Sequence, residues 1–296
     1  MTQVQYIRTA DYAAAAKALG VAVEVVKTVA AVEARQSGFI GDSDLPWILF
    51  EGHHFHRRTG GQYSRDYPQI SYPRWTKAHY RGGRGEYDRL MEAIEVHSGS
   101  VEPALLSTSW GMFQIMGFNF DKCGYASVED FVNDMGTGEP AHLRAFVAFI
   151  RACGLADELQ GQDWEDFARQ YNGPGYKRNA YHTKLAAEFA KACAAAQEIR
   201  TGGEISFERG DAVALQSALN VALGDLLPTK LVPDGWIGPK TKRAIRLFQR
   251  QNGLSETGLV DSALCAELGL EFEHADLLMA GAGASGSRLR TITQRQ

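Results

Sequence analysis

Apolar side chains between Val21 and Phe39 recur every three or four positions, the spacing expected on one face of an amphipathic helix. Val25, Val29 and Val32 belong to this face. Glu33 comes four positions after Val29, so it continues the apolar stripe instead of facing water. The pattern therefore predicts a helix that carries a carboxylic acid on its buried side.

We expect this helix to be a long one. Thr9–Asp11 can cap its start, and the helical pattern then runs to about Glu33, where Gly38 offers a stop signal. Glu33 would then lie near the helix C-terminus, where desolvation and the helix dipole both disfavour its charged form. Both effects raise the pKa and keep the acid protonated for general-acid chemistry. The alternative is a Glu33 at the edge of the stripe that pairs with a base such as Arg35.

Helical periodicity dominates the rest of the first 200 residues, which we expect to be mainly α. One exception is Thr59–Arg84, a Gly-, Pro- and Tyr-rich excursion that reads as a loop or a small hairpin. Its aromatic side chains suit sugar stacking or ordinary packing equally well. The predicted helices are Glu86–His97, Pro103–Leu106, Ser127–Asp134, Glu139–Cys153, Asp163–Gln170 and Lys177–Arg200.

A short polar connector, Thr201–Ser206, is the best candidate for a domain boundary. Beyond it we expect a bundle of three helices, at Asp211–Leu223, Pro239–Gln251 and Asp261–Leu268. We therefore divide the chain into a domain at 1–200, a linker at 201–207, a second domain at 208–270 and a tail at 271–296. The small, polar residues of the tail predict flexibility from about Ala280.

Composition narrows the class of protein. A hydrophobic fraction of 45% and a net charge of -4 are typical of a globular protein and give no reason to expect nucleic acid as a partner. The four cysteines are widely spaced and predict free thiols. No stretch of about 18 apolar residues occurs, so we expect no stable membrane insertion, and the N-terminus does not resemble a signal peptide.

Two further segments carry candidate chemistry. Ser109–Met116 contains Gly111, which permits a tight turn, and Gln114, an amide among apolar neighbours. Tyr171 and Asn172 follow a helix and precede a Gly-Pro-Gly segment. Each has a plainer interpretation: Gln114 as a satisfied core amide, and Tyr171 as a core aromatic.

The three histidines at positions 53, 54 and 56 invite a zinc hypothesis. The HExxH pattern is absent, however, and adjacent side chains point to different faces of a helix. We therefore expect no metal and no cofactor, and we expect a short helix in which these histidines lie beside Arg57 and Arg58.

Three motifs in order resemble the superfamily of soluble lytic transglycosylases and goose-type lysozymes. They are Glu33 with Ser37-Gly38-Phe39, then Gly111-Met112-Phe113-Gln114, then Tyr171-Asn172-Gly173. The sequence around these motifs, including ILFEGHHFHR, is similar to the N-acetylmuramidases of phage endolysins. This similarity extends over nearly all of residues 8–196. Three departures are visible: Ser37 does not follow the glutamate directly, Phe113 stands where the family has Met, and Gly173-Pro174 replaces Ala-Gly.

The resemblance implies a lysozyme-like domain that cleaves a β-1,4 bond of peptidoglycan, with Glu33 as the general acid. Ser109, Gln114, Tyr171 and Asn172 would line the cleft and bind the substrate. Hydrolysis commonly needs a second carboxylate, for which Asp42, Asp44 and Glu51 are the candidates. A lytic transglycosylase would need none, because a hydroxyl of the sugar itself attacks and leaves a 1,6-anhydro end. A zinc amidase or a non-catalytic wall-binding phage protein are the remaining alternatives.

The second domain is similar to the three-helix peptidoglycan-binding domain over residues 208–269. The matching positions are Leu215-Gln216, Leu219, Asp234-Gly235-Trp236-Ile237-Gly238, Thr241, Ala244-Ile245, Phe248-Gln249 and Gly253-Leu254. Taken together, the resemblances imply a monomeric endolysin that is made in the host cytoplasm and lyses the host. It would reach the periplasmic wall through a pore made by a holin.

Overall fold

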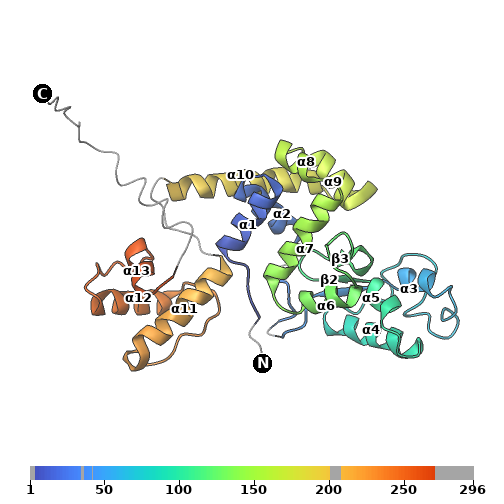
Figure 1. The fold of residues 1–296 in the computed structure, drawn as a ribbon, viewed down its shortest axis with the longest axis horizontal. Coiled ribbons are helices and arrows are strands. Elements are labelled where there is room, and N and C mark those ends of the chain that lie inside the picture. The colour runs from blue at the N-terminus through green and yellow to red at the C-terminus, as the bar shows by residue number, and fades with distance from the viewer. Residues whose placement is uncertain (1–3, 35–36, 42, 201–207, 271–296) are drawn as a thin grey trace, which may run out of the picture. The chain divides into compact units, whose positions relative to one another are not determined.

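The computed structural model describes residues 4–34, 37–41, 43–200 and 208–270 (Figure 1). The chain divides into two compact units, Met1–Cys193 and Ala194–Gln296. The core of the first unit includes residues from Ile7 to Leu185, and that of the second includes residues from Leu215 to Leu264. The described residues are mainly α, as the sequence predicts. No described helix is both long and apolar enough to cross a membrane.

The single long helix expected before Glu33 is in fact two helices, α1 (Thr9–Leu19) and α2 (Val23–Glu33). Gly20 ends α1 in the left-handed conformation, with φ of 68°, which glycine adopts without steric cost. The Val21 N–H then bonds to the Ala16 carbonyl. The chain therefore turns, and α2 starts in a new direction.

Helix α2 ends earlier than Gly38. Ala34 already has extended backbone angles, with φ of -77° and ψ of 130°, so Glu33 is the last helical residue. The segment after it makes an isolated bridge between Phe39 and Pro46. The prediction that Gly38 stops the helix is therefore wrong, whereas the position of Glu33 at the C-terminus of a helix is confirmed.

A small antiparallel sheet, which the sequence did not predict, forms the middle of the first unit. Its strands are β1 (Ile48–Phe50), β2 (Thr108–Trp110) and β3 (Ile115–Met116), in the order β1-β2-β3. Leu49 pairs with Ser109, and Ser109 pairs with Met116. Gly111 and Gln114, with φ of 70° and 51°, shape the turn between β2 and β3.

Helices surround this sheet and complete the first unit. The predicted capped starts are confirmed, because Ser127 and Asp163 accept hydrogen bonds from the N–H groups of Asp130 and Asp166. A short helix, α8, was not predicted. The remaining helices are α3 (Gly52–Arg58), α4 (Arg84–Val96), α5 (Glu102–Leu106), η1 (Gly117–Asn119), α6 (Val128–Met135), α7 (Glu139–Ala152), α8 (Ala156–Gly161), α9 (Trp164–Asn172), η2 (Gly173–Gly175) and α10 (Tyr181–Arg200).

The excursion between α3 and α4 is a loop. It consists of turns and bends without a strand, so of the two expected forms the loop is correct and the hairpin is not. The histidines at 53, 54 and 56 lie on the short helix α3, as expected.

The second unit contains α11 (Arg209–Leu223), η3 (Gly224–Leu226), α12 (Pro239–Gln251) and α13 (Ser262–Glu267). All three predicted helices are present, and Pro239 opens α12 as expected. Leu215, Leu219, Ile245, Phe248 and Leu264 are buried between them. The predicted linker at 201–207 and the tail from 271 lie outside the described residues.

Candidate active site

A cavity of about 460 Å³ opens within the first unit. Its walls come from segments far apart in the sequence: the end of α2, all three strands and the turn between β2 and β3, α7, the end of α9 and the first residue of α10. The polar side chains that line it belong to Glu33, Glu51, Ser109, Gln114, Asn119, Tyr171, Asn172 and Tyr181. The fold therefore gathers Glu33, Ser109, Gln114, Tyr171 and Asn172 around one space.

Glu33 lies at the cavity wall and is partly buried. Burial raises the pKa of its carboxyl group, while the Asn172 amide and the positive charge of Lys184 lower it by less. The amide Nδ2 of Asn172 donates a hydrogen bond to Oε1 of Glu33 at 3.0 Å. The expectation of a raised pKa is confirmed. Arg35, the alternative partner for Glu33, lies outside the described residues.

Tyr171 is held beside Glu33 by a cluster of aromatic rings. Its ring stacks on Phe167 at 5.4 Å and meets the edges of Phe146 and Phe149 at 5.9 and 6.2 Å. Burial raises the pKa of the Tyr171 hydroxyl, and the charge of Glu33 raises it further. The rigid ring therefore presents a protonated hydroxyl group, a hydrogen-bond donor, at the cavity wall.

The Ser109 and Gln114 side chains bind to each other and to the backbone. Ser109 Oγ donates to Gln114 Oε1 at 3.0 Å, and Gln114 Nε2 donates to the carbonyls of Gly111 at 2.8 Å and Trp47 at 3.2 Å. These bonds hold Gln114 in its left-handed backbone conformation, which a non-glycine residue rarely adopts. Gln114 is thus a satisfied amide that also lines the cavity.

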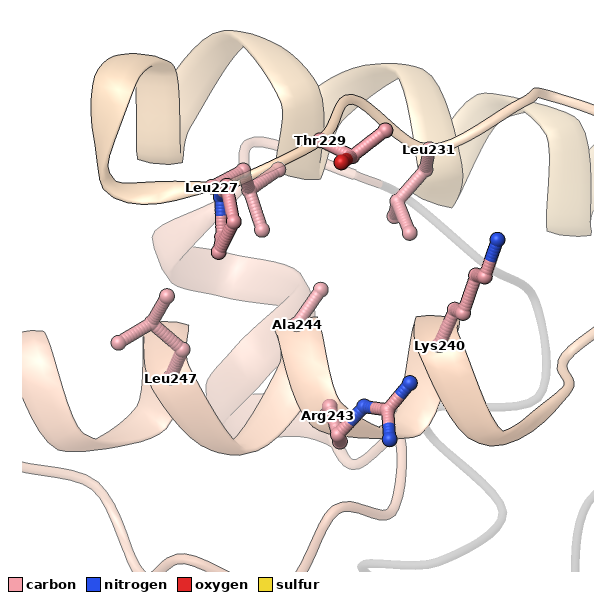
Figure 2. Close-up of a pocket in the computed structure, with 8 residues that line it drawn as sticks. Leu227, Thr229, Leu231, Lys240, Arg243, Ala244 and Leu247 are labelled. Carbon is pink, nitrogen blue, oxygen red and sulfur yellow. The ribbon is translucent and has the colours of Figure 1, made fainter.

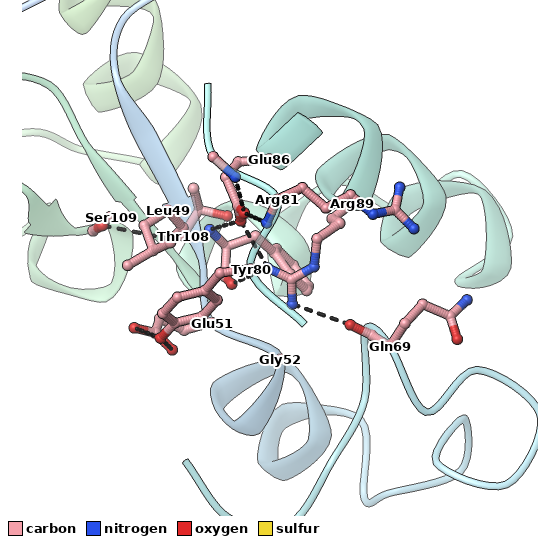
Figure 3. A network of polar contacts seen from close by, with 12 residues as sticks. Leu49, Glu51, Gly52, Gln69, Tyr80, Arg81, Glu86, Arg89, Thr108 and Ser109 are labelled. Carbon is pink, nitrogen blue, oxygen red and sulfur yellow. Dashed lines mark hydrogen bonds and ion pairs between the residues drawn. The ribbon is translucent and has the colours of Figure 1, made fainter. Parts of the chain in front are cut away.

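Glu51 follows β1 and borders the same cavity as Glu33. The Tyr80 hydroxyl donates to its carboxylate and lies 2.8 Å from both oxygens (Figure 3). His53 Nδ1 lies 3.2 Å from Oε2 without forming a hydrogen bond to it. Burial raises the pKa of Glu51, while the Tyr80 hydroxyl and the Arg89 charge act in the opposite direction. Burial lowers the pKa of His53, which favours a neutral ring.

A buried ion pair fixes the backbone next to Glu51. Arg89 and Glu86, both fully buried, are joined at 2.7 Å (Figure 3). Glu86 accepts hydrogen bonds from the N–H groups of Phe50, Arg81 and Gly82, and Arg89 donates to the carbonyls of Phe50 and Gln69. The pair thereby joins β1 to the middle and to the C-terminal end of the loop that carries Tyr80. Sequence analysis missed this pair, although its i,i+3 spacing was visible.

Two residues of α7 support the segment that follows α2. Glu139 accepts hydrogen bonds from Gly38 N–H at 3.0 Å and from Ser37 Oγ at 3.3 Å. His142 stacks on Phe39 at 5.2 Å and accepts a hydrogen bond from Met112 N–H through Nδ1 at 3.1 Å. A Cβ atom at Gly38 would come within 2.5 Å of the His142 ring, and one at Gly111 within 3.0 Å. Both motif glycines therefore make room for this buried histidine.

The other predicted side chains lie elsewhere. Asp44 is exposed in a turn and is not part of the cavity lining, and Asp42 lies outside the described residues. His54 and His56 have separate partners, Arg57 and Ser64. Among the residues that the structure describes, no three His, Cys, Asp or Glu side chains are arranged to hold a metal ion.

Comparison with known proteins finds matches for both units of the chain. A model of the N-acetylmuramidase family matches residues 22–193, and a model of a putative peptidoglycan-binding domain matches residues 208–268. The crystal structure of an endolysin from Burkholderia AP3 phage is 36% identical, with a TM-score of 0.60. That similarity covers 65% of this chain and 72% of the endolysin chain. A search of curated proteins found no match.

The family match covers more than half of the chain and includes most of the cavity wall. Together with the second match, it confirms the resemblances drawn from the motifs. The chain belongs to the N-acetylmuramidase family and is a glycoside hydrolase that degrades peptidoglycan.

Proposed function

We propose that the protein hydrolyses the β-1,4 bond between N-acetylmuramic acid and N-acetylglucosamine, with Glu33 as the general acid. The observation that carries the proposal is the raised pKa of Glu33 in the wall of the cavity. Breaking a glycosidic bond requires a proton on the leaving oxygen while positive charge develops on the sugar. A carboxyl group whose pKa is raised by burial holds its proton to higher pH and can supply that proton to the leaving oxygen.

Asn172 orients the acid. Its Nδ2 donates to Oε1 of Glu33, so the proton of a neutral Glu33 resides on Oε2. Asn172 itself lines the cavity and is the last residue of α9. The hydrogen bond thus leaves the protonated oxygen available to the substrate.

Glu51 is the second carboxylate in our proposal. Of the three candidates, Glu51 is the one that lines the cavity within the described part of the chain. The hydrogen bond from Tyr80 favours its ionised form. An ionised Glu51 would stabilise the developing positive charge or activate a water molecule.

Substrate binding falls to the remaining lining residues. Tyr171 and Asn172 line the cavity together with Glu33 and would contact the sugar there. Ser109 and Gln114 would act by fixing the turn between β2 and β3 and by offering oxygen atoms as acceptors.

Analysis of the products tests the reaction. Digests of purified peptidoglycan should contain new reducing ends on N-acetylmuramic acid, seen by mass spectrometry after borohydride reduction. Ends that are 1,6-anhydro would instead identify a lytic transglycosylase, and reducing ends on N-acetylglucosamine would place the cleavage at the other glycosidic bond. Released amino groups without new reducing or anhydro sugar ends would rule out cleavage of any glycosidic bond.

We also propose that the biological role is lysis of a bacterial host. The similarity to a phage endolysin supports this role. The protein would act as a monomer and reach the wall from the host cytoplasm through a pore that a second protein makes. Expression alone should leave the host intact, and co-expression with a pore-forming protein should clear the culture. Clearing without the pore-forming partner would contradict this route.

A further inference from the structure

The second unit has a cavity of its own, of about 270 Å³, between α12 and the loop that follows η3 (Figure 2). Its apolar surface comes from Leu227 and Leu231 on the loop and from Ala244 and Leu247 on α12. These four side chains are aliphatic, so the cavity offers no aromatic face for a sugar ring. Its lining is instead suited to small apolar groups.

Two cationic side chains, Lys240 and Arg243, border this apolar surface (Figure 2). Both are exposed on α12, one helical turn apart. Neither forms an ion pair within the described residues, whereas Arg250 on the same helix pairs with Glu256. Lys240 also lies in the first turn of α12, where the helix dipole adds positive potential. The cavity is therefore apolar inside and positive at its edge.

We propose that this cavity binds the stem peptide of peptidoglycan. Alanine methyl groups of the stem would contact the aliphatic surface, and a free carboxylate would lie between Lys240 and Arg243. A glycan strand whose lactyl groups carry stem peptides has no free carboxylate of its own for the two cations. The inference rests on the family match of residues 208–268 and not on the cleavage chemistry proposed above.

The first test uses the free tetrapeptide L-Ala–D-γ-Glu–diaminopimelate–D-Ala, titrated into the full-length protein by calorimetry. Because this probe has no sugar, its binding is independent of cleavage. The double variant Lys240→Glu, Arg243→Glu should weaken binding by about tenfold or more, and added salt should weaken binding to the wild type. Arg246→Glu changes an exposed arginine of α12 outside the cavity lining and should leave binding unchanged.

A second variant separates the effect of the cavity's shape on binding from the effect of its charge. Thr229→Trp places a bulky side chain into the cavity from an exposed loop position and leaves every charge intact. It should also abolish binding of the tetrapeptide, while thermal unfolding stays at the wild-type temperature. Binding that survives both Thr229→Trp and the double charge reversal would overturn the proposal.

The second test compares two forms of the wall, each immobilised on beads, in a pull-down assay with the full-length protein. Beads that carry intact sacculi should retain more of the protein than beads that carry glycan strands freed of stem peptides by an amidase. Equal retention on the peptide-free strands would overturn the proposal. Loss of that retention in Trp236→Ala would then assign binding to the glycan and to Trp236, whose ring is 67% exposed.

Discussion

Glu33 combines two properties that rarely coincide in one side chain. Glu33 is the last residue of α2, and its carboxyl group is partly buried in the cavity wall. The carboxyl group also accepts a hydrogen bond from Asn172. Burial raises its pKa, so the folded protein penalises the ionised form. A group with a raised pKa lowers the stability of the fold as the pH rises above its unfolded value. At neutral pH, Glu33 therefore lowers the stability of the fold. We propose that the same raised pKa allows it to act as the catalytic acid.

Replacing Glu33 with Gln tests both consequences at once. The rate of wall cleavage should fall by about 10²- to 10⁴-fold, the usual contribution of a general acid. The melting temperature at pH 7 should rise, because the amide keeps an oxygen for Asn172 but carries no charge to desolvate. The control is Glu24→Gln, a change at a half-buried position in the first turn of the same helix, which should leave the rate of wall cleavage unchanged. Wild-type cleavage by Glu33→Gln would rule out Glu33 as the acid.

The bond between Tyr80 and Glu51 predicts a shift in the pH profile. If ionised Glu51 is required, activity rises with pH as Glu51 loses its proton. Tyr80→Phe removes the donor that favours the ionised form. The pKa of Glu51 should then rise, and the acidic limb of kcat against pH should move to higher pH.

Tyr87→Phe provides a matched control for this shift. The Tyr87 hydroxyl donates to the Pro46 carbonyl, which does not titrate, so its loss should leave the acidic limb in place. An acidic limb that stays unchanged in Tyr80→Phe as well would show that Glu51 does not set it.

At the scale of elements, α7 supports the site without touching the acid. His142 is fully buried, accepts from Met112 N–H and donates from Nε2 to the Met135 carbonyl at 2.8 Å. The bond from Met112 N–H needs a neutral ring, because only an unprotonated Nδ1 can accept a hydrogen bond. Burial lowers the pKa of His142 to about 4, although the Met135 bond acts in the opposite direction. The turn between β2 and β3 and the segment after α2 thus depend on an uncharged imidazole.

This histidine predicts acid sensitivity of the fold. Its pKa is lower in the folded chain than the ordinary value of 6.5, so its stabilising contribution is complete above pH 6.5 and is lost as the pH falls toward 4. At about 1.4 kcal/mol per pKa unit, the loss amounts to about 3 kcal/mol. Urea unfolding at several pH values should show a flatter decline for His142→Gln than for the wild type. Parallel declines would assign the sensitivity to other groups.

The sequence predicts elements well where the signal is local. Helical periodicity and capping residues correctly predicted α4, α6, α7 and α9. Pro239, at a favourable first helical position, correctly predicted the start of α12. Prediction from the sequence failed where a single residue or a contact between distant positions determines the structure. The break at Gly20 is a single left-handed residue inside an unbroken apolar pattern. The three strands have two or three residues each, and β1 pairs with β2 across about 60 positions, which no local periodicity reports.

The same distinction applies to the site. Glu33 stood out because its own helix placed it on an apolar face, and Tyr171 and Asn172 stood out because of their motif. Glu86 and Arg89 are neighbours on one helix, but their burial, like the roles of Glu139 and His142, depends on contacts with segments distant in sequence. Charged residues on a helix normally face water, so their burial could be recognised only from the folded chain.

At the scale of the whole molecule, the two units have separate cores and separate cavities. Each therefore contains what it needs to fold by itself. We expect the first to cleave and the second to hold the enzyme on an insoluble substrate. Tethering raises the local concentration of bonds around the catalytic unit, a gain that disappears when the substrate is small and soluble.

A fragment of residues 1–200 should therefore behave differently on two substrates. On soluble glycan oligomers that fit the first cavity, its kcat and KM should equal those of the full chain. On sacculi, clearance at low enzyme concentration should fall by about tenfold or more, since the second binding event is lost. Full-length protein with Lys240→Glu and Arg243→Glu should follow the fragment on sacculi if the stem-peptide site provides the tether. Equal clearance by the fragment and the full chain would mean that the first unit binds the wall unaided. A fragment that is inactive on the oligomers would mean that the first unit needs the second for activity.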